Sequence, residues 1–385
     1  MIPESISEMG QEIPSTDRTS VPGLREFLAI ENWTKRDIPP ADRLLGDLVT
    51  TTTRIFLVGS TGLGKTLLAL GMACGMASGR GFLHWRADRA AKVLYIDGEM
   101  PAELIKARSV DALRRLDGSK PRGNLSIFAR DSEEEFAKKF PKLPRFAPLN
   151  TKPGQDFVLE LIGALGGVDA VVFDNVMSLV DGDQKDEVPW TETLPLVSAL
   201  TTMRVAQVWA DHTGHDRSKQ YGSSTKAWRF DAVGLMAALP DEEKTHQGIG
   251  FTLSFEAPGK ARRRMPDNWR DFETRVIRLN EDVWTSEPFG DDAPSKAADK
   301  LAPSVRPFYA ALMDALAVSD RPGVTTKEAW FAEAVRSGAA VAITDDDNHA
   351  AKEKKRGPFR KALFSIKAAG LIGVNNEDVS DLRKP

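Results

Sequence analysis

The chain has 385 residues, a formal net charge of -3 and a single cysteine, Cys74. Its length exceeds that of one ordinary domain, so we expect a large domain and a smaller one. The near-neutral charge excludes a globally basic nucleic-acid binder, and one cysteine excludes an intramolecular disulfide. No apolar run approaches the ~20 residues of a membrane helix and no secretory signal is recognisable, so we expect a cytoplasmic protein without a membrane partner.

Composition divides the chain into four segments. Residues 1–29 are mostly polar and predict a flexible leader. Residues 30–285 alternate apolar, strand-like runs with helical patterns, which predicts an α/β domain with a mainly parallel sheet flanked by helices. Residues 286–304 are rich in Pro, Ala, Ser and Asp without periodicity and predict a linker, which leaves residues 305–385 as a small second domain.

The strands expected in the large domain are apolar runs, and the last two are expected to form an antiparallel edge. In chain order they are residues 54–59, 92–98, 125–130, 170–175, 206–212, 232–239, 250–256 and 274–279. Parallel sheets of this kind bind their ligands at the carboxyl ends of the strands. Chemically active residues are therefore expected there.

One glycine-rich segment follows the first of these strands. The sequence "GSTGLGKT" lies between that strand and a helical pattern. Phosphate groups need inward-facing backbone N–H groups and the positive end of a helix, which glycines at this spacing permit. Lys65 is predicted to reach the β- and γ-phosphates and Thr66 to ligate Mg²⁺. The segment predicted to bind ATP comprises Gly59, Ser60, Thr61, Gly62, Leu63, Gly64, Lys65 and Thr66.

Two further strands end in carboxylates. Asp174 ends the strand 170–175, and the next residue, Asn175, is an amide that cannot act as a base. The carboxylate that activates water must then come from elsewhere, and "YIDGEMP" offers Glu99 after the strand that follows the phosphate-loop helix. We assign Asp174 to magnesium and Glu99 to water. Asp97 lies earlier on its strand and is expected to be structural.

This division of labour resembles the RecA and DnaB branch of the P-loop ATPases. Within it, segments 59–66, 93–101, 171–190 and 208–224 look like the RepA-type hexameric replicative helicases of mobile genetic elements and their ATPase relatives. The resemblance spans about Asp37 to Asn280. It implies a RecA-like core that hydrolyses ATP with Mg²⁺, and a homo-oligomeric ring, here a hexamer.

The same resemblance implies two further catalytic residues. His212 matches the residue that senses the γ-phosphate at the end of its strand, and Arg262 matches the basic finger that reaches the nucleotide of the adjacent subunit. A structural histidine and a solvated basic cluster are the alternatives for the two positions. Other candidates are Asp211 and His215 for the sensor, and Lys260 and Arg263 for the finger.

Two loops are implied to face the ring's channel. The loop 214–228 suits single-stranded DNA, with cations for phosphates and an aromatic ring for stacking: Arg217, Lys219, Lys226 and Tyr221. The loop 181–190 does not suit DNA, since four acids accompany Lys185: Asp181, Asp183, Asp186 and Glu187. These acids argue against translocation on DNA unless they pair with the neighbouring subunit.

The carboxyl-terminal domain shows three helical patterns, residues 306–318, 325–338 and 357–370, followed by a short apolar run. The second is expected to open with a capping box of Thr325 and Glu328, and the third to begin at Pro358. This arrangement resembles a winged helix-turn-helix. Arg360 and Lys361 on the last helix are candidates for nucleic-acid contact, and a solvated basic face is the alternative.

The sequence thus predicts a ring-forming ATP-dependent DNA helicase or motor of plasmid or phage replication, with a replication protein as a possible partner of the carboxyl-terminal domain. A second hypothesis, favoured by the acidic loop, is a RecA-like DNA ATPase that does not unwind: a loader, a recombination mediator or a regulatory switch. A third is a small-molecule P-loop kinase, which would have no use for a separate Glu99 or a finger in trans.

Overall fold

The structure is a computed structural model with two units, residues up to Pro40 and residues from Ala41 onward. The residues that it describes are 21–116, 120–183, 187–212, 229–239, 248–255, 261–265, 267–280, 282–289, 301–321 and 323–381. In the first unit, α1 (Leu24–Leu28) and α2 (Ile30–Trp33) are short helices without a buried residue. The sequence predicted neither helix, and α1 lies within the expected leader, of which residues 1–20 are outside the described residues.

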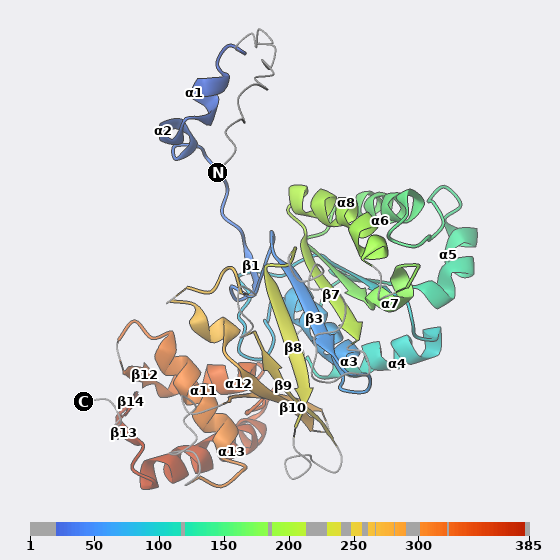
Figure 1. Cartoon of the computed structure of the whole chain (residues 1–385). Helices are drawn as coiled ribbons and strands as arrows, with labels where there is room; N and C mark the ends of the chain where they lie inside the picture. Colours follow the sequence, from blue (N-terminus) through green and yellow to red (C-terminus); the bar gives the residue numbers. More distant parts are fainter. Residues whose placement is uncertain are drawn as a thin grey trace, which may run out of the picture. The chain divides into compact units, whose positions relative to one another are not determined.

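A nine-stranded sheet organises the second unit, in the order β11-β10-β9-β8-β3-β7-β6-β4-β5 (Figure 1). The strands from β8 to β5 in this order run parallel, and β9, β10 and β11 continue the sheet antiparallel. Their bounds are β3 (Arg54–Gly59), β4 (Val93–Asp97), β5 (Leu125–Ala129), β6 (Ala170–Asp174), β7 (Ala206–His212), β8 (Ala232–Ala238), β9 (Gly248–Ser254), β10 (Arg275–Asn280) and β11 (Val283–Pro288).

Every strand expected from the sequence is present, but β11 was not expected. It pairs with β10 along its whole length and includes residues 286–288, which the sequence assigned to the linker. Because β11 contains Thr, Ser, Glu and Pro besides its apolar residues, its composition does not distinguish it from a linker. A short hairpin of β1 (Arg43–Leu45) and β2 (Val49–Thr50) was also missed.

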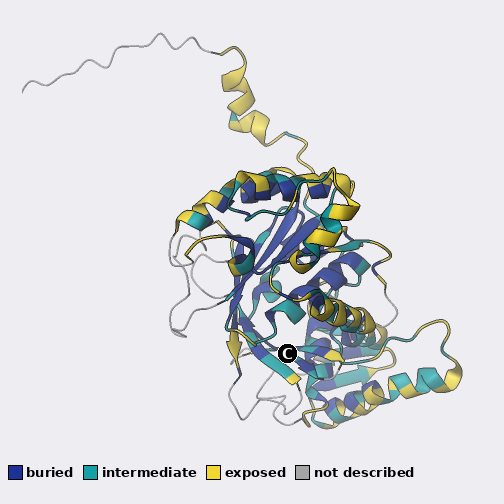
Figure 2. Ribbon diagram, turned by 90° about the vertical axis from the view of Figure 1, so that its right-hand side faces the viewer, coloured by how far each residue is buried: buried dark blue, intermediate teal, exposed yellow. Residues whose placement is uncertain are grey.

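Helices cover both faces of the sheet, and the alternation of side chains along each strand supplies two cores. Ile55 and Leu57 of β3 pack with α3 and α4, whereas Phe56 and Val58 pack with α6 and α8. Figure 2 shows the strands buried between helices whose outer faces are exposed. The bounds are α3 (Lys65–Ser78), α4 (Ala102–Arg114), α5 (Glu133–Lys139), α6 (Lys152–Ala164), α7 (Val176–Leu179) and α8 (Val188–Thr202), with 3₁₀ turns at Arg130–Ser132 and Trp269–Phe272.

The carboxyl-terminal region has its own apolar core and a three-stranded antiparallel sheet of order β12-β14-β13. In chain order its elements are α11 (Arg306–Ala317), β12 (Val324–Thr326), α12 (Lys327–Arg336), α13 (His349–Ala368), β13 (Ile372–Asn375) and β14 (Asp378–Asp381). The fold class predicted from the sequence is confirmed: a RecA-like core with a mainly parallel sheet precedes a small α-rich region. Among the described residues, no helix is long and apolar enough to cross a membrane.

Two helix starts in this region differ from the sequence prediction. Thr326, not Thr325, caps α12, since its hydroxyl accepts the N–H of Ala329 and Thr325 lies in β12. Helix α13 begins at His349, where the side chain of Asn348 accepts the N–H of Ala351 at 2.9 Å. Pro358 therefore lies inside the helix rather than at its start, so the preference of proline for a first turn gave the wrong boundary.

Candidate active site

The site is assembled at the carboxyl ends of four adjacent strands. β7 lies between β3 and β6, and β4 lies on the far side of β6. The register pairs Gly59 of β3 with His212 of β7, and Asp174 of β6 with Asp97 of β4. Residues that are far apart in the sequence thereby form a row along one edge of the sheet.

The phosphate loop joins β3 to α3. Gly62 and Gly64 have φ angles of 84° and 92°, in the left-handed region that favours glycine. A Cβ at Gly64 would also lie 2.7 Å from Ile249 Cγ2, so the loop passes close to β9. Lys65 is buried, and its Nζ donates to the carbonyls of Gly59 at 2.6 Å and Ser60 at 2.9 Å. Burial lowers the pKa of Lys65 to about 8.

Asp174 ends β6 beneath the phosphate loop. It is buried, accepts a hydrogen bond from the Tyr95 hydroxyl at 2.6 Å, and is also hydrogen-bonded to the side chain of Thr66. Burial raises the pKa of Asp174 despite these bonds. The predicted magnesium pair, Thr66 and Asp174, is therefore brought together.

Asp97 stabilises the turn after β4 and is not part of the Thr66–Asp174 pair. Its Oδ1 accepts the backbone N–H of Met100 at 2.8 Å, which fixes the turn that leads to α4. Its Oδ2 is buried without a hydrogen-bond partner among the described residues. Burial raises the pKa of Asp97 to about 7.

Glu99, Asn175 and His212 form a hydrogen-bonded group that reaches the phosphate loop. The Nδ2 of Asn175 donates to Glu99 and lies 3.0 Å from His212 Nε2, while Glu99 Oε2 is 3.5 Å from the same nitrogen. His212 Nδ1 is 3.2 Å from the hydroxyl of Thr61. The Glu99 side chain is 56% exposed, which leaves its carboxylate accessible to water. The structure thus connects the predicted water-activating acid to the predicted sensor.

The residues present fit a magnesium–nucleotide complex. Thr66 and Asp174 offer hard oxygen ligands, and Mg²⁺ is commonly held by one or two protein oxygens plus substrate phosphates. No group of three or more His, Cys, Asp or Glu residues suited to a metal occurs in the described part of the chain. A pocket of about 150 Å³ adjoins Lys65, Thr66, Asp174 and His212.

Sequence reasoning missed several residues of this site. Asn175 was considered only as an unsuitable base, yet it is the side chain that joins Glu99 to His212. Tyr95 holds Asp174, and Arg108 of α4 lines the pocket beside the phosphate loop, with its Nη1 3.0 Å from the sulfur of Met100. The position of Asn175 directly after a strand-end acid is a signal that could have identified it. No local sequence pattern identifies Arg108, because only the packing of α4 brings it near the phosphate loop.

Two of the finger candidates, Arg262 and Arg263, directly follow a residue that pairs with β8. Ala261 forms a bridge with Ala232, and the N–H of Arg262 donates to Asp231 O at 2.8 Å. Arg262 is exposed, whereas the guanidinium of Arg263 donates to the hydroxyls of Thr50 and Thr52 in the same chain.

Several predicted residues lie outside the described residues: Lys185, Asp186, His215, Arg217, Lys219, Tyr221, Lys226 and Lys260. Their roles stay predictions. Arg360 and Lys361 are exposed on α13, and Arg360 pairs with Glu353 at 2.9 Å.

Comparison with known proteins identifies the family of the chain. The profile described as "AAA domain" matches residues 22–218, just over half of the chain. One of the solved structures that match is a KaiC-like protein from the hyperthermophilic archaeon Pyrococcus horikoshii, with 12% sequence identity and a TM-score of 0.43, over 65% of this chain and 100% of that one. No curated protein matches the sequence.

Proposed function

Because the chain belongs to the AAA-domain family and is a RecA-like P-loop ATPase, we propose that it hydrolyses ATP with Mg²⁺ in a homo-oligomeric, hexameric ring and works on single-stranded DNA as a helicase or motor of plasmid or phage replication. The RepA-type replicative helicases are the functional type that its motifs resemble. The observation that carries the proposal is the group of Glu99, Asn175 and His212 at the phosphate loop.

In this proposal Glu99 accepts a proton from the attacking water. The amide of Asn175 donates to Glu99 and so orients the carboxylate, while leaving one of its oxygens for water. His212, in contact with Thr61, is placed to register whether a γ-phosphate occupies the loop. When bound, Mg²⁺ supplies charge neutralisation at the phosphates, and Thr66 and Asp174 are the residues that would hold it.

Assembly into a ring is supported by the basic segment beside β8. A finger must project from its own subunit, and Arg263 is hydrogen-bonded to Thr50 of its own chain. Arg262 is the exposed member of the pair and is our candidate for the residue that completes the neighbouring site. Such a finger neutralises charge that develops during transfer and is worth about 10³–10⁵ in rate.

The test compares Glu99→Gln with Glu103→Gln, the same isosteric change at an exposed acid of α4. Glu99→Gln should bind ATP normally but lose turnover, because an amide cannot accept the proton. Glu103→Gln should retain both. Normal hydrolysis by Glu99→Gln would contradict the assignment, and so would an equal loss in both variants.

The DNA part of the proposal is tested separately, by ATP turnover with and without single-stranded DNA and then by strand displacement. We expect stimulation by DNA, followed by displacement of a paired strand. Stimulation without displacement would favour a DNA ATPase that does not unwind, which the exposed acids Asp181 and Glu187 already support. Turnover that is indifferent to DNA would contradict both.

A further inference from the structure

Helix α13 has one buried and one exposed face. Phe359, Ala362 and Ile366 pack into the core of the carboxyl-terminal region. On the opposite side, Phe364 is 73% exposed, the highest value among the large apolar side chains that the structure describes. The ring of Phe364 is not part of this core and is accessible to a partner.

The exposed ring is surrounded by cations. At helical spacing, Lys361 and Lys367 lie three residues before and after Phe364, and Arg360 lies four residues before it. The only acid of α13, Glu353, is paired with Arg360. Lys361 and Lys367 are exposed, and neither has an ion-pair partner among the described residues. The face therefore combines an aromatic ring with positive charge that its own helix does not neutralise.

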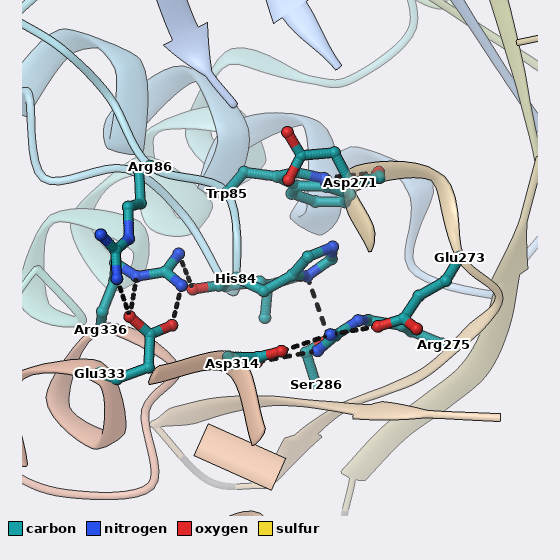
Figure 3. Close-up of polar contacts among 11 residues, drawn as sticks. His84, Trp85, Arg86, Asp271, Glu273, Arg275, Ser286, Asp314, Glu333 and Arg336 are labelled. Carbon is teal, nitrogen blue, oxygen red and sulfur yellow. Dashed lines mark hydrogen bonds and ion pairs between the residues drawn. The ribbon is translucent and has the colours of Figure 1, made fainter. Parts of the chain in front are cut away.

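A buried polar network holds the region that carries this face against the ATPase core (Figure 3). Arg275 of β10 is 1% exposed and donates to Asp314 of α11, with Nη2 2.7 Å from Oδ1. Arg336 of α12 donates to Leu83 O at 2.9 Å.

A second ion pair of this network involves α12. Glu333 of α12 is also buried and pairs with Arg86 at 2.9 Å. Leu83 and Arg86 belong to the segment between α3 and β4, the elements that carry Lys65 and precede Glu99.

We propose that the exposed face of α13, centred on Phe364 and flanked by Lys361 and Lys367, binds single-stranded nucleic acid, and that the buried network fixes this face to the ATPase core. The lysines contact phosphates and the phenylalanine ring stacks on a base. From Lys361 to Lys367 the helix rises about 9 Å, enough for contacts on both sides of a stacked base. This deepens the proposed function by adding a DNA contact outside the channel loops.

The chemistry of the face favours nucleic acid over other anionic partners. Binding to an anionic membrane needs an apolar face of several side chains, and Phe364 is the only exposed large apolar residue of α13. An acidic peptide would pair with the lysines but has no need of an exposed aromatic ring. Bases offer a flat surface to that ring in every sequence context.

The test measures binding of the full chain, without nucleotide, to a labelled oligo(dT) strand by fluorescence anisotropy at several salt concentrations. Phe364→Ala should weaken binding about ten-fold and Phe364→Trp should restore it, because tryptophan also stacks. Lys361→Ala/Lys367→Ala should lower the slope of log affinity against log salt by about 1.4, at about 0.7 for each phosphate contact. The matched control, Lys138→Ala/Lys139→Ala, removes two exposed lysines from α5 and should leave both quantities unchanged.

Three outcomes would overturn the inference: wild-type affinity in Phe364→Ala and in the α13 lysine variant, an equal loss in the α5 control, or equal affinity for a poly-glutamate peptide of the same length. Preference for a duplex over the single strand would overturn the stacking role of Phe364. The result is separable from the proposed function, since no ATP is present. A chain that binds DNA through α13 but shows no DNA-stimulated turnover contradicts only the proposed function.

Discussion

The ion pair between Arg275 and Asp314 gives a quantitative prediction about how the carboxyl-terminal region is attached. Arg275 is 1% exposed and Asp314 is 7% exposed, so Asp314→Ala would leave a buried guanidinium with only Glu273 as a charged partner. Removing one partner of a buried pair costs about 3–5 kcal/mol, and the remaining carboxylate places the expected loss near the lower limit, about 3 kcal/mol. Urea unfolding followed by tryptophan fluorescence would measure it, as buried Trp85 and Trp330 report on the two sides.

Two further variants serve as controls for Asp314→Ala. Asp378→Ala breaks a solvent-exposed pair with Arg321, which is 53% exposed, and should cost far less than Asp314→Ala because water and salt screen such a pair. Glu273→Leu/Arg275→Met/Asp314→Leu replaces all three charges of this buried group by apolar side chains and should cost less than Asp314→Ala alone. If Asp314→Ala costs no more than Asp378→Ala, the buried network does not hold the two regions together, and its role in fixing α13 fails with it.

Three other predictions follow from the same structure. Arg262→Ala should lower turnover by about 10³ or more without loss of ATP affinity, and mixing it with Glu99→Gln should restore activity; an inactive mixture of co-assembled variants would rule out a finger in trans. Burial raises the pKa of Asp271 from 3.8 to about 6, so the folded state binds a proton that the unfolded state releases, and stability is lost as pH rises through this range. The free energy of unfolding of Asp271→Asn, relative to that of the wild type, should therefore increase by up to about 3 kcal/mol from pH 4 to pH 8. If the urea midpoints of the two proteins differ by the same amount at both pH values, this reasoning is refuted. Burial raises the pKa of the Cys74 thiol to about 12, so a thiol reagent at pH 8 should modify it only as fast as the chain opens; rapid labelling of the native protein would show the thiol to be accessible.

Local sequence was sufficient for most of the sheet and for the phosphate loop. Strands such as β3 and β6 are buried on both faces, so each is a continuous apolar run. Such a run can be recognised without knowing which strands lie beside it. The loop from Gly59 to Thr66 is likewise a local solution to phosphate binding, because its glycines and its helix start are adjacent in the chain. Glu99 and Asp174 were identifiable because acids at strand ends interrupt apolar runs.

Local sequence patterns gave the wrong structure where the same pattern is compatible with two conformations. Pro358 follows Gly357 in a pattern typical of a helix start, but Asn348 supplies an earlier cap and the helix continues through the proline. β11 has the composition of a linker and is a strand because β10 offers it an edge. In both cases the deciding interaction comes from residues outside the window in which the pattern was read.

Only the tertiary structure shows which of the distant residues lie in contact. The order of strands puts β7 between β3 and β6, and this brings His212 next to Thr61 and lets Asn175 join His212 to Glu99. The network around Arg275 likewise joins residues from β10, β11 and α11. The contacts within either group have no signature in the sequence, because hydrogen bonds and buried ion pairs depend on distances of a few ångströms between groups that the chain separates by tens to hundreds of residues.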